Sequence, residues 1–230
     1  MERAWKATVR PGLRRQSQVD MHDYLDVHRN LRPYLEHLRA DVITGRYRPA
    51  EAALTRLEKQ NGITRRIPLP SPSDAIVLQT IVDALEPRIK RWQPTTSAYY
   101  SRSHKAPSVE DIDASFSYPW WELWPQFQSR IWSFSDQFPY TVVTDVATYY
   151  DTIPLGSLRH AIASLGRFRQ DVMDLLFYML EAFIWRPEYI PVTGVGLPQL
   201  NFDAPRLLAH AYLFPVDRLL QKLTNKNFVR

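Results

Sequence analysis

The sequence predicts a mixed α+β fold, and three observations lead to this prediction. Helical patterns dominate both ends of the chain, a single hairpin pattern surrounds residue 60, and one short β-branched run ends at Asp145. Helices and strands that segregate, instead of alternating regularly, are typical of α+β domains. The 230 residues can bury a sizeable core and suggest one large domain or two closely packed lobes.

Composition excludes several classes of protein. The chain has no cysteine, which rules out a disulfide framework and a thiolate metal site. No apolar stretch approaches the length needed to span a membrane, so no membrane partner is expected. The opening "MERAWKATVRPGLRRQ" lacks the hydrophobic core of a signal peptide. We therefore expect a soluble protein with a cytoplasmic location.

The net charge of +5 is distributed unevenly along the chain. Residues 1–70 carry 14 Lys/Arg against 8 Asp/Glu, whereas the remainder carries 15 against 16. A basic first part suits a polyanionic partner such as nucleic acid. The alternative is a set of solvated arginines on helix surfaces, and charge alone favours that alternative.

The first half of the chain predicts helix, hairpin and helix. Apolar residues recur at helical spacing over 20–45, and Gly45 and Pro49 then break the pattern. Residues 54–70 predict a hairpin, because "QNG" is a turn pattern and the residues after it alternate. Ser71 before Pro72 is a plausible cap for a helix over 71–89.

The second half predicts an irregular segment, a strand and more helices. Residues 93–139 are rich in proline and serine and contain Trp120, Trp121 and Trp124, which either stack on bases or pack a surface segment onto the core. We favour packing. The β-branched run predicts a buried strand over 140–145. Helices are expected over 155–165, 168–185 and 204–223, the last interrupted by Pro215.

Three pieces of the sequence carry candidate chemistry. A tight turn brings Lys59 and Arg65 together, where two cations suit a triphosphate, or are ordinary basic residues of an exposed hairpin. Asp145 at a strand end offers the hard oxygen that Mg²⁺ prefers, or is a turn residue. The loop "GVGLPQL" has glycines that permit close backbone approach, or simply leads into a helix. Asp151 or Thr152 is expected to cap the helix after Pro154.

The order and spacing of these pieces resemble the reverse transcriptase family, most closely its bacterial group II intron, retron and defence-associated members. The resemblance covers roughly residues 40–230. It rests on a fingers pattern of Lys59, Gly62, Arg65, Leu69-Pro70, Asp74 and Gln79; on "SAYYSRSH" at 97–104; on "VVTDVATYYDTI"; on "GLPQ" at 196–199; and on "LLAHAYLFPVDRLL", which ends its pattern at Asp217.

The resemblance implies a right-hand polymerase fold and an RNA-directed DNA polymerase, a metal-dependent nucleotidyltransferase. Its cofactor would be Mg²⁺, or Mn²⁺ in its place, and its partners an RNA template, a DNA or RNA primer and a dNTP. Asp145 would be the catalytic metal ligand, together with the Val146 carbonyl. The resemblance assigns nucleotide binding to Lys59, Arg65, Tyr150 and Gln199, and nucleic-acid binding to Arg66, Arg102, Gly196 and Pro198. The Tyr150 ring would exclude the 2′-hydroxyl of a ribonucleotide.

The same resemblance divides the chain into four parts. Residues 1–95 would form the N-terminal helical region and the fingers, and 96–152 the first part of the palm, with its strand ending at Asp145. Residues 153–190 would be a helical fingers/palm segment, and 191–230 the Gly-Leu-Pro-Gln loop with an incomplete palm helix.

Two departures from the family pattern affect the functional interpretation. Leu200 replaces the glycine that usually follows Gly-Leu-Pro-Gln, which favours the anti-phage defence relatives. The Tyr-x-Asp-Asp motif that completes the metal site is absent, so we expect a fragment truncated before that hairpin and the thumb, inactive alone. A non-catalytic nucleic-acid-binding module derived from such an enzyme is the alternative. A helical toxin or scaffold with accidental matches is the least favoured interpretation.

Overall fold

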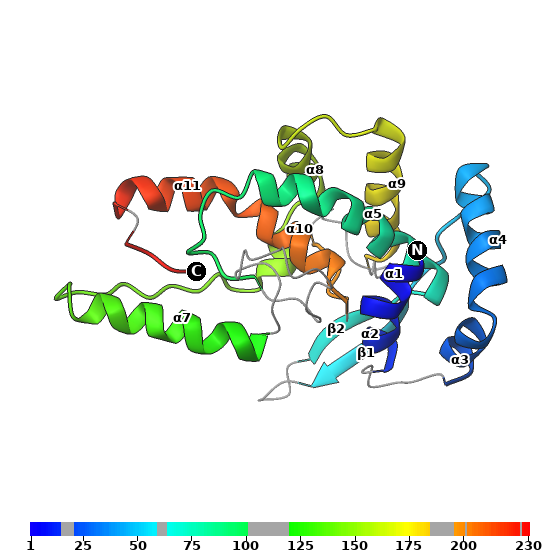
Figure 1. The fold of residues 1–230 in the computed structure, drawn as a ribbon, viewed down its shortest axis with the longest axis horizontal. Coiled ribbons are helices and arrows are strands. Elements are labelled where there is room, and N and C mark those ends of the chain that lie inside the picture. The colour runs from blue at the N-terminus through cyan, green and yellow to red at the C-terminus, as the bar shows by residue number, and fades with distance from the viewer. Residues whose placement is uncertain (15–20, 59–63, 101–119, 185–195, 201, 226) are drawn as a thin grey trace.

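The fold is α+β in the coarse sense: a helical molecule with one small sheet (Figure 1). The computed structural model describes residues 1–14, 21–58, 64–100, 120–184, 196–200, 202–225 and 227–230. The side chains of residues 21–23 and 64–66 are not described. Within the described residues, no helix is both long enough and apolar enough to cross a membrane.

The chain starts with a helical segment that lies outside the predicted elements. It consists of α1 (Glu2–Ala4), a π-helical turn η1 (Trp5–Val9) and α2 (Arg10–Arg14). Its inward face is formed by residues that recur in pairs every four positions: Ala4, Trp5, Thr8, Val9, Gly12 and Leu13. Trp5 and Val9 are fully buried in the main core, and both α1 and η1 pack against α5.

The helix predicted over 20–45 forms as two helices, α3 (Met21–Arg29) and α4 (Leu31–Ile43), which are separated at Asn30. The predicted hairpin is confirmed as β1 (Ala53–Glu58) and β2 (Thr64–Leu69). The two strands pair antiparallel with Leu57 opposite Arg65. The predicted turn between them lies outside the described residues.

The long helix α5 (Pro72–Arg91) crosses the centre of the molecule and starts where the sequence predicts (Figure 1). Ser71 caps it, because its hydroxyl oxygen accepts a hydrogen bond from the Asp74 amide at 3.2 Å. The buried Asp74 carboxylate accepts bonds in return from the Ser71 hydroxyl at 2.8 Å, the Ala50 amide at 3.2 Å and the Tyr47 hydroxyl. Burial and this bond raise the pKa of Tyr47. Asp74 thus fixes the start of α5 to the chain that leads into the hairpin.

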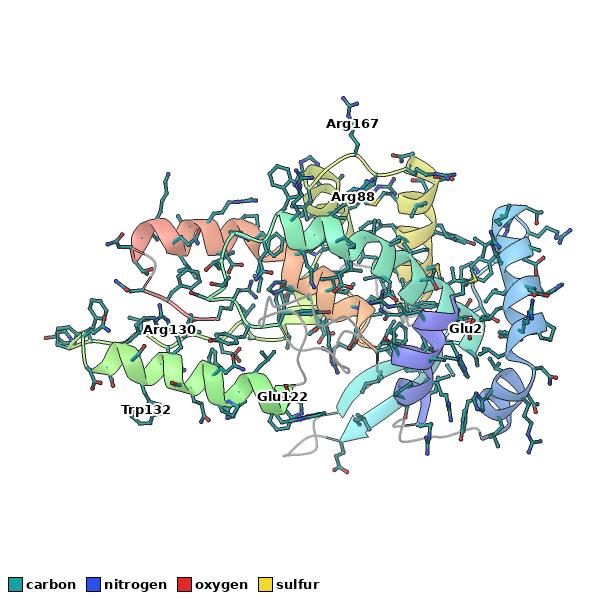
Figure 2. All side chains as sticks on the ribbon, in the orientation of Figure 1. Glu2, Arg88, Glu122, Arg130, Trp132 and Arg167 are labelled. Atoms are coloured by element: carbon teal, nitrogen blue, oxygen red, sulfur yellow. The ribbon has the colours of Figure 1, made fainter. Side chains whose placement is uncertain are left out.

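The prediction of an irregular segment over 93–139 is wrong for its last part. Residues Trp120–Ser135 form the helix α7, despite Pro125 within it. The expected packing of the tryptophans onto the core is also wrong, since Trp120, Trp121 and Trp124 are 62%, 53% and 50% exposed. Figure 2 shows the exposed Trp132 side chain pointing away from the body of the molecule. The inner side of α7 is anchored by Phe127, whose ring meets that of Tyr99 edge-on at 5.8 Å.

The predicted buried strand over 140–145 does not form. Residues 140–146 have no regular structure, and Tyr140, Val142 and Val143 are about 90% exposed. A strand needs a partner for its backbone groups, and the only strands among the described residues are β1 and β2, which pair with each other. A β-branched run alone therefore does not produce a strand here.

The helices of the second half match the predictions closely. They are α8 (Leu155–Ser164), α9 (Gln170–Ala182), α10 (Ala204–Tyr212) and α11 (Phe214–Leu223). The break between α10 and α11 falls at Leu213, because Pro215 occupies the start of the new helix. The expected cap before α8 is wrong: its N-cap is Pro154, and the Thr152 hydroxyl instead donates to the Tyr149 carbonyl. Helices α5, α8, α9 and α10 pack together around the main core.

Candidate functional site

Two of the motifs that are far apart in sequence meet in the structure. The segment after Asp145 turns into a short 3₁₀ helix, η3 (Tyr149–Thr152). The loop that carries Gly-Leu-Pro-Gln lies directly against this turn. The Leu197 amide donates to the Tyr150 carbonyl at 2.8 Å, and the Gly196 amide donates to the Ile153 carbonyl at 3.0 Å. We call residues 145–153 and 196–199 together the motif junction.

Gly196 is suited to its place in the motif junction for two reasons. Its φ of +123° is a conformation that residues with a side chain rarely adopt. A Cβ at this position would lie 3.6 Å from the Asp151 carbonyl oxygen, so the loop approaches the η3 backbone closely. The sequence predicts that glycines in this loop let the backbone approach a ligand closely. The structure shows an approach of Gly196 to η3, Gly194 lies outside the described residues, and approach to a ligand stays a prediction.

Thr148, which lies between Asp145 and η3, has a left-handed backbone conformation. Its φ is +48°, which is uncommon for a β-branched residue. Strained backbone of this kind persists when surrounding contacts hold it, and it is concentrated at functional sites. Here the contacts on the C-terminal side come from Tyr149 and Tyr150, whose rings meet at a centroid distance of 5.8 Å.

Tyr149 connects the motif junction to helix α10. Its hydroxyl donates to the Ala209 carbonyl at 2.6 Å, and burial raises the pKa of its phenol. The sequence pattern gives Tyr149 no role. Two adjacent tyrosines on a short turn nevertheless suggest that one of them points inward. Tyr150 is half-buried beside it.

A buried charged pair supports α10 and α11 behind Tyr149. The Asp217 carboxylate is fully buried and receives both arms of the Arg230 guanidinium, at 2.7 and 2.6 Å. The backbone of Arg230 in turn pairs with the segment before Tyr100: its amide donates to the Ser97 carbonyl at 3.0 Å. The resemblance singles out Asp217 as part of a helix pattern, but the sequence offers no signal that Arg230 would be its partner.

His210 is buried between two aromatic rings on the same side of α10. Its ring lies 5.0 Å from that of Tyr100 and 5.3 Å from that of Phe214. Burial lowers the pKa of His210 to about 3, and the positive charge of Arg230 contributes in the same direction. The imidazole is therefore neutral at physiological pH, as expected of a core residue.

Asp145 is exposed at the start of the motif junction, and Val146 beside it is 54% exposed. Among the residues that the structure describes, no group of three or more His, Asp or Glu side chains is arranged to hold a metal ion. Mg²⁺ requires one or two carboxylates from protein, and a site for two ions requires more. The motif junction offers two exposed carboxylates, Asp145 and Asp151, and the described donors do not by themselves fit a pair of metal ions.

The rest of the Gly-Leu-Pro-Gln loop is well anchored. Leu197 and Pro198 are buried, whereas Gln199 is half-buried. Leu200, the residue that departs from the family pattern, is 6% exposed and belongs to the main core. The departure thus has a structural explanation, because a leucine here adds apolar area to the core at the point where the loop returns to α10.

The fingers residues are only partly placed. Lys59 and Arg102 lie outside the described residues, as do the side chains of Arg65 and Arg66, although β2 carries both arginines next to each other in the hairpin. Gln79 from the same pattern has a structural position. It is buried, accepts a hydrogen bond from the Ala204 amide at 2.9 Å, and so satisfies the first turn of α10.

Comparison with known proteins adds no assignment: neither the protein-family models nor the curated proteins contain a match to this sequence.

Proposed function

We propose that this chain forms the fingers and part of the palm of an RNA-directed DNA polymerase. The reaction is transfer of a nucleotide from a dNTP to the 3′-hydroxyl of a primer on an RNA template. The observation that carries this proposal is the motif junction. Hydrogen bonds from Gly196 and Leu197 bring together two motifs whose residues are assigned to a single nucleotide site.

Two residues of the motif junction, Tyr150 and Gln199, and two residues of the hairpin contact the nucleotide in this proposal. The Tyr150 ring lies beneath the sugar of the incoming nucleotide and excludes a 2′-hydroxyl. Gln199 is half-buried at the end of the loop and offers both a donor and an acceptor to the nucleotide or the template. Lys59 and Arg65 reach the triphosphate from the hairpin, where their charges offset those of the phosphates.

Asp145 contributes one carboxylate to the metal site, and the proposal requires further carboxylates from outside the described residues. Mg²⁺, when bound, supplies charge neutralisation at the reacting phosphate. The exposed position of Asp145 is compatible with this role, since its carboxylate is open to solvent. The biological programme that we favour is anti-phage defence, on the basis of Leu200.

The test is primer extension on an RNA template by the protein expressed from its native coding sequence. Asp145→Asn removes the carboxylate charge with little change in shape, and we expect it to abolish metal-dependent extension. Asp136→Asn is the matched control, because Asp136 is an exposed aspartate in the segment that leads to Asp145. Extension by the Asp145→Asn protein at the wild-type rate would refute the polymerase proposal.

A non-catalytic nucleic-acid-binding module is the second candidate, and it is favoured because no group of three or more metal-ligating side chains occurs among the described residues. The two candidates differ in nucleotide binding. A polymerase binds a dNTP and discriminates against the matching ribonucleotide, whereas the module binds RNA alone. Titration with a fluorescent dNTP separates them: saturable binding weakened by Gln199→Ala supports the polymerase, and absence of binding supports the module.

A further inference from the structure

We propose that Lys6, Arg10 and Arg14 form a binding site for consecutive phosphates of a nucleic-acid strand. Among the described residues, these three side chains and Pro11 line a cavity of about 440 Å³ beside the N-terminal helical segment. This site extends the proposed function, because it adds a contact with the template on residues that precede the fingers. The identification of the bound strand as the template rests on the proposed function.

The helix geometry explains why the three cations share one side. They follow each other at intervals of four residues, next to the inward face that includes Trp5 and Val9. In an α-helix, side chains four residues apart differ in direction by about 40° around the helix axis, because a turn takes about 3.6 residues. The π-helical turn is wider, as shown by the Arg10 amide, which donates to the Trp5 carbonyl five residues earlier. A wider turn reduces this difference in direction and keeps the cations together.

The two arginines have unused binding capacity. Within the described part of the chain, neither Arg10 nor Arg14 has an ion-pair partner. The Nε atom of Arg10 is buried and has no hydrogen-bond partner there. Burial of a donor without a partner is costly, so a ligand that supplies an acceptor at this point is favoured.

Lys6 is paired, but weakly. Its ammonium lies 2.6 Å from the Glu2 carboxylate, and the two side chains are 59% and 64% exposed. Figure 2 shows Glu2 on the same helical segment, at the N-terminal end. An exposed pair of this kind contributes little to stability, because solvent screens both charges, so a polyanion can displace the carboxylate. Glu2 is therefore a competitor that holds Lys6 in the absence of ligand.

The length of the row indicates a strand of phosphates as the ligand. Eight residues separate Lys6 from Arg14, which corresponds to about 12 Å along a helix at a rise of about 1.5 Å per residue. Three cations spread over this length suit several phosphates in a row better than one phosphate. The segment is also firmly supported, because Trp5 and Val9 are fully buried against the core.

The test is binding of a fluorescent 12-nucleotide oligouridine without magnesium, measured over a range of salt concentrations. The triple variant K6Q/R10Q/R14Q should weaken binding by roughly tenfold or more and reduce the slope of log affinity against log salt by about 2, at roughly 0.7 per lost phosphate contact on a single strand. The control R39Q/R218Q/K222Q removes the same charge from exposed positions on α4 and α11, and it should have a much smaller effect. Glu2→Gln should tighten binding because it frees Lys6.

Several outcomes would overturn the inference. Equal losses in the triple variant and its control would show that only net charge matters. Binding of inorganic tripolyphosphate that depends on the three cations, without an effect on the oligouridine, would assign the site to a small anion. If the triple variant fails to fold by circular dichroism, the double variant K6Q/R14Q, which retains the half-buried Arg10, replaces it with an expected slope change of about 1.4.

The design separates this inference from the proposed function. Oligouridine binding without magnesium reports on the three cations of the cavity, whereas primer extension reports on Asp145. Loss of RNA binding in the triple variant, together with extension that does not depend on Asp145, would remove the polymerase proposal alone. Unchanged RNA binding in the triple variant, together with extension that does depend on Asp145, would remove the phosphate site alone.

Discussion

Gly196 is the residue at which backbone conformation constrains the motif junction most tightly. Gly196→Ala places a side chain on a backbone with φ of +123°, and we expect a loss of about 1–3 kcal/mol in the free energy of unfolding. Urea denaturation measures this loss. Gly156→Ala is the control, because Gly156 lies within α8 and a Cβ there meets nothing within 4 Å. That change should stabilise by up to about 1 kcal/mol, and a similar response at both glycines would contradict the account.

His210 should make the protein sensitive to acid. Its pKa is about 3 in the folded state, below the ordinary value of 6.5, so the unfolded chain binds more protons between these values. The contribution of His210 to the free energy of unfolding is therefore fully present above pH 6.5. It decreases as the pH falls toward 3, by up to about 1.4 kcal/mol per pH unit. His210→Phe keeps an aromatic ring between Tyr100 and Phe214 and should flatten this dependence in thermal denaturation between pH 6.5 and 4. An unchanged profile would show that other groups govern acid sensitivity.

The sequence identifies the residues of the motif junction but not the partners that hold them in place. Gly196 and Tyr150 follow from the motif pattern, because glycine and aromatic residues have recognisable uses. The Tyr149 bond to Ala209 involves a backbone carbonyl, and any residue type can provide one. Arg230 could not be matched to Asp217, because the pair depends on how the end of the chain folds back past Ser97.

At the scale of elements, the buried pair of Asp217 and Arg230 should be a main support of α11. Arg230→Ala leaves the carboxylate buried without its partner, and we expect a loss of about 3–5 kcal/mol in unfolding free energy. Arg230→Lys keeps the charge but loses the two-armed geometry, so its loss should be intermediate. Arg169→Ala breaks the exposed pair with Asp171 and should cost far less than Arg230→Ala, because solvent screens both charges. Equal losses for Arg230→Ala and Arg169→Ala in urea denaturation would contradict this role.

The sequence predicts the helices whose apolar residues recur with strong helical periodicity. It does not predict whether a segment that needs a distant partner will form regular structure. Helices α8 and α9 form close to their predicted bounds, because their apolar residues pack on one side into the main core. The run over 140–145 has strand-forming residues but no neighbouring strand, so it stays irregular. The sequence does not predict helix α7, because the segment is rich in aromatic residues and contains proline. Most of its residues are also exposed, so no buried apolar face marks it as a helix.

At the scale of the whole molecule, the exposed tryptophans of α7 should promote self-association. Trp120 and Trp132 are 62% and 70% exposed, and exposed large apolar side chains favour association. We expect the sedimentation coefficient to rise with protein concentration, and Trp120→Gln with Trp132→Gln to suppress that rise. Tyr178→Gln changes an exposed aromatic on α9 and serves as the control. Concentration-independent sedimentation of the unchanged protein would contradict this expectation.

The central functional claim is that the hairpin cations and the motif junction flank one bound nucleotide. The absence of cysteine allows a direct distance measurement, since introduced cysteines are the only sites for nitroxide labels. One pair of labels replaces Glu58, the exposed last residue of β1, and Val146, which leaves Lys59 and Arg65 in place to bind the triphosphate. A reference pair replaces Glu58 and Arg167, whose exposed side chain projects from the opposite side of the view from the hairpin (Figure 2). Dipolar spectroscopy then compares the two distance distributions. The account predicts that the 58–146 distance is the shorter one and narrows when a dNTP and Mg²⁺ are added, whereas a 58–146 distance as long as the reference, with no response to nucleotide, would contradict it.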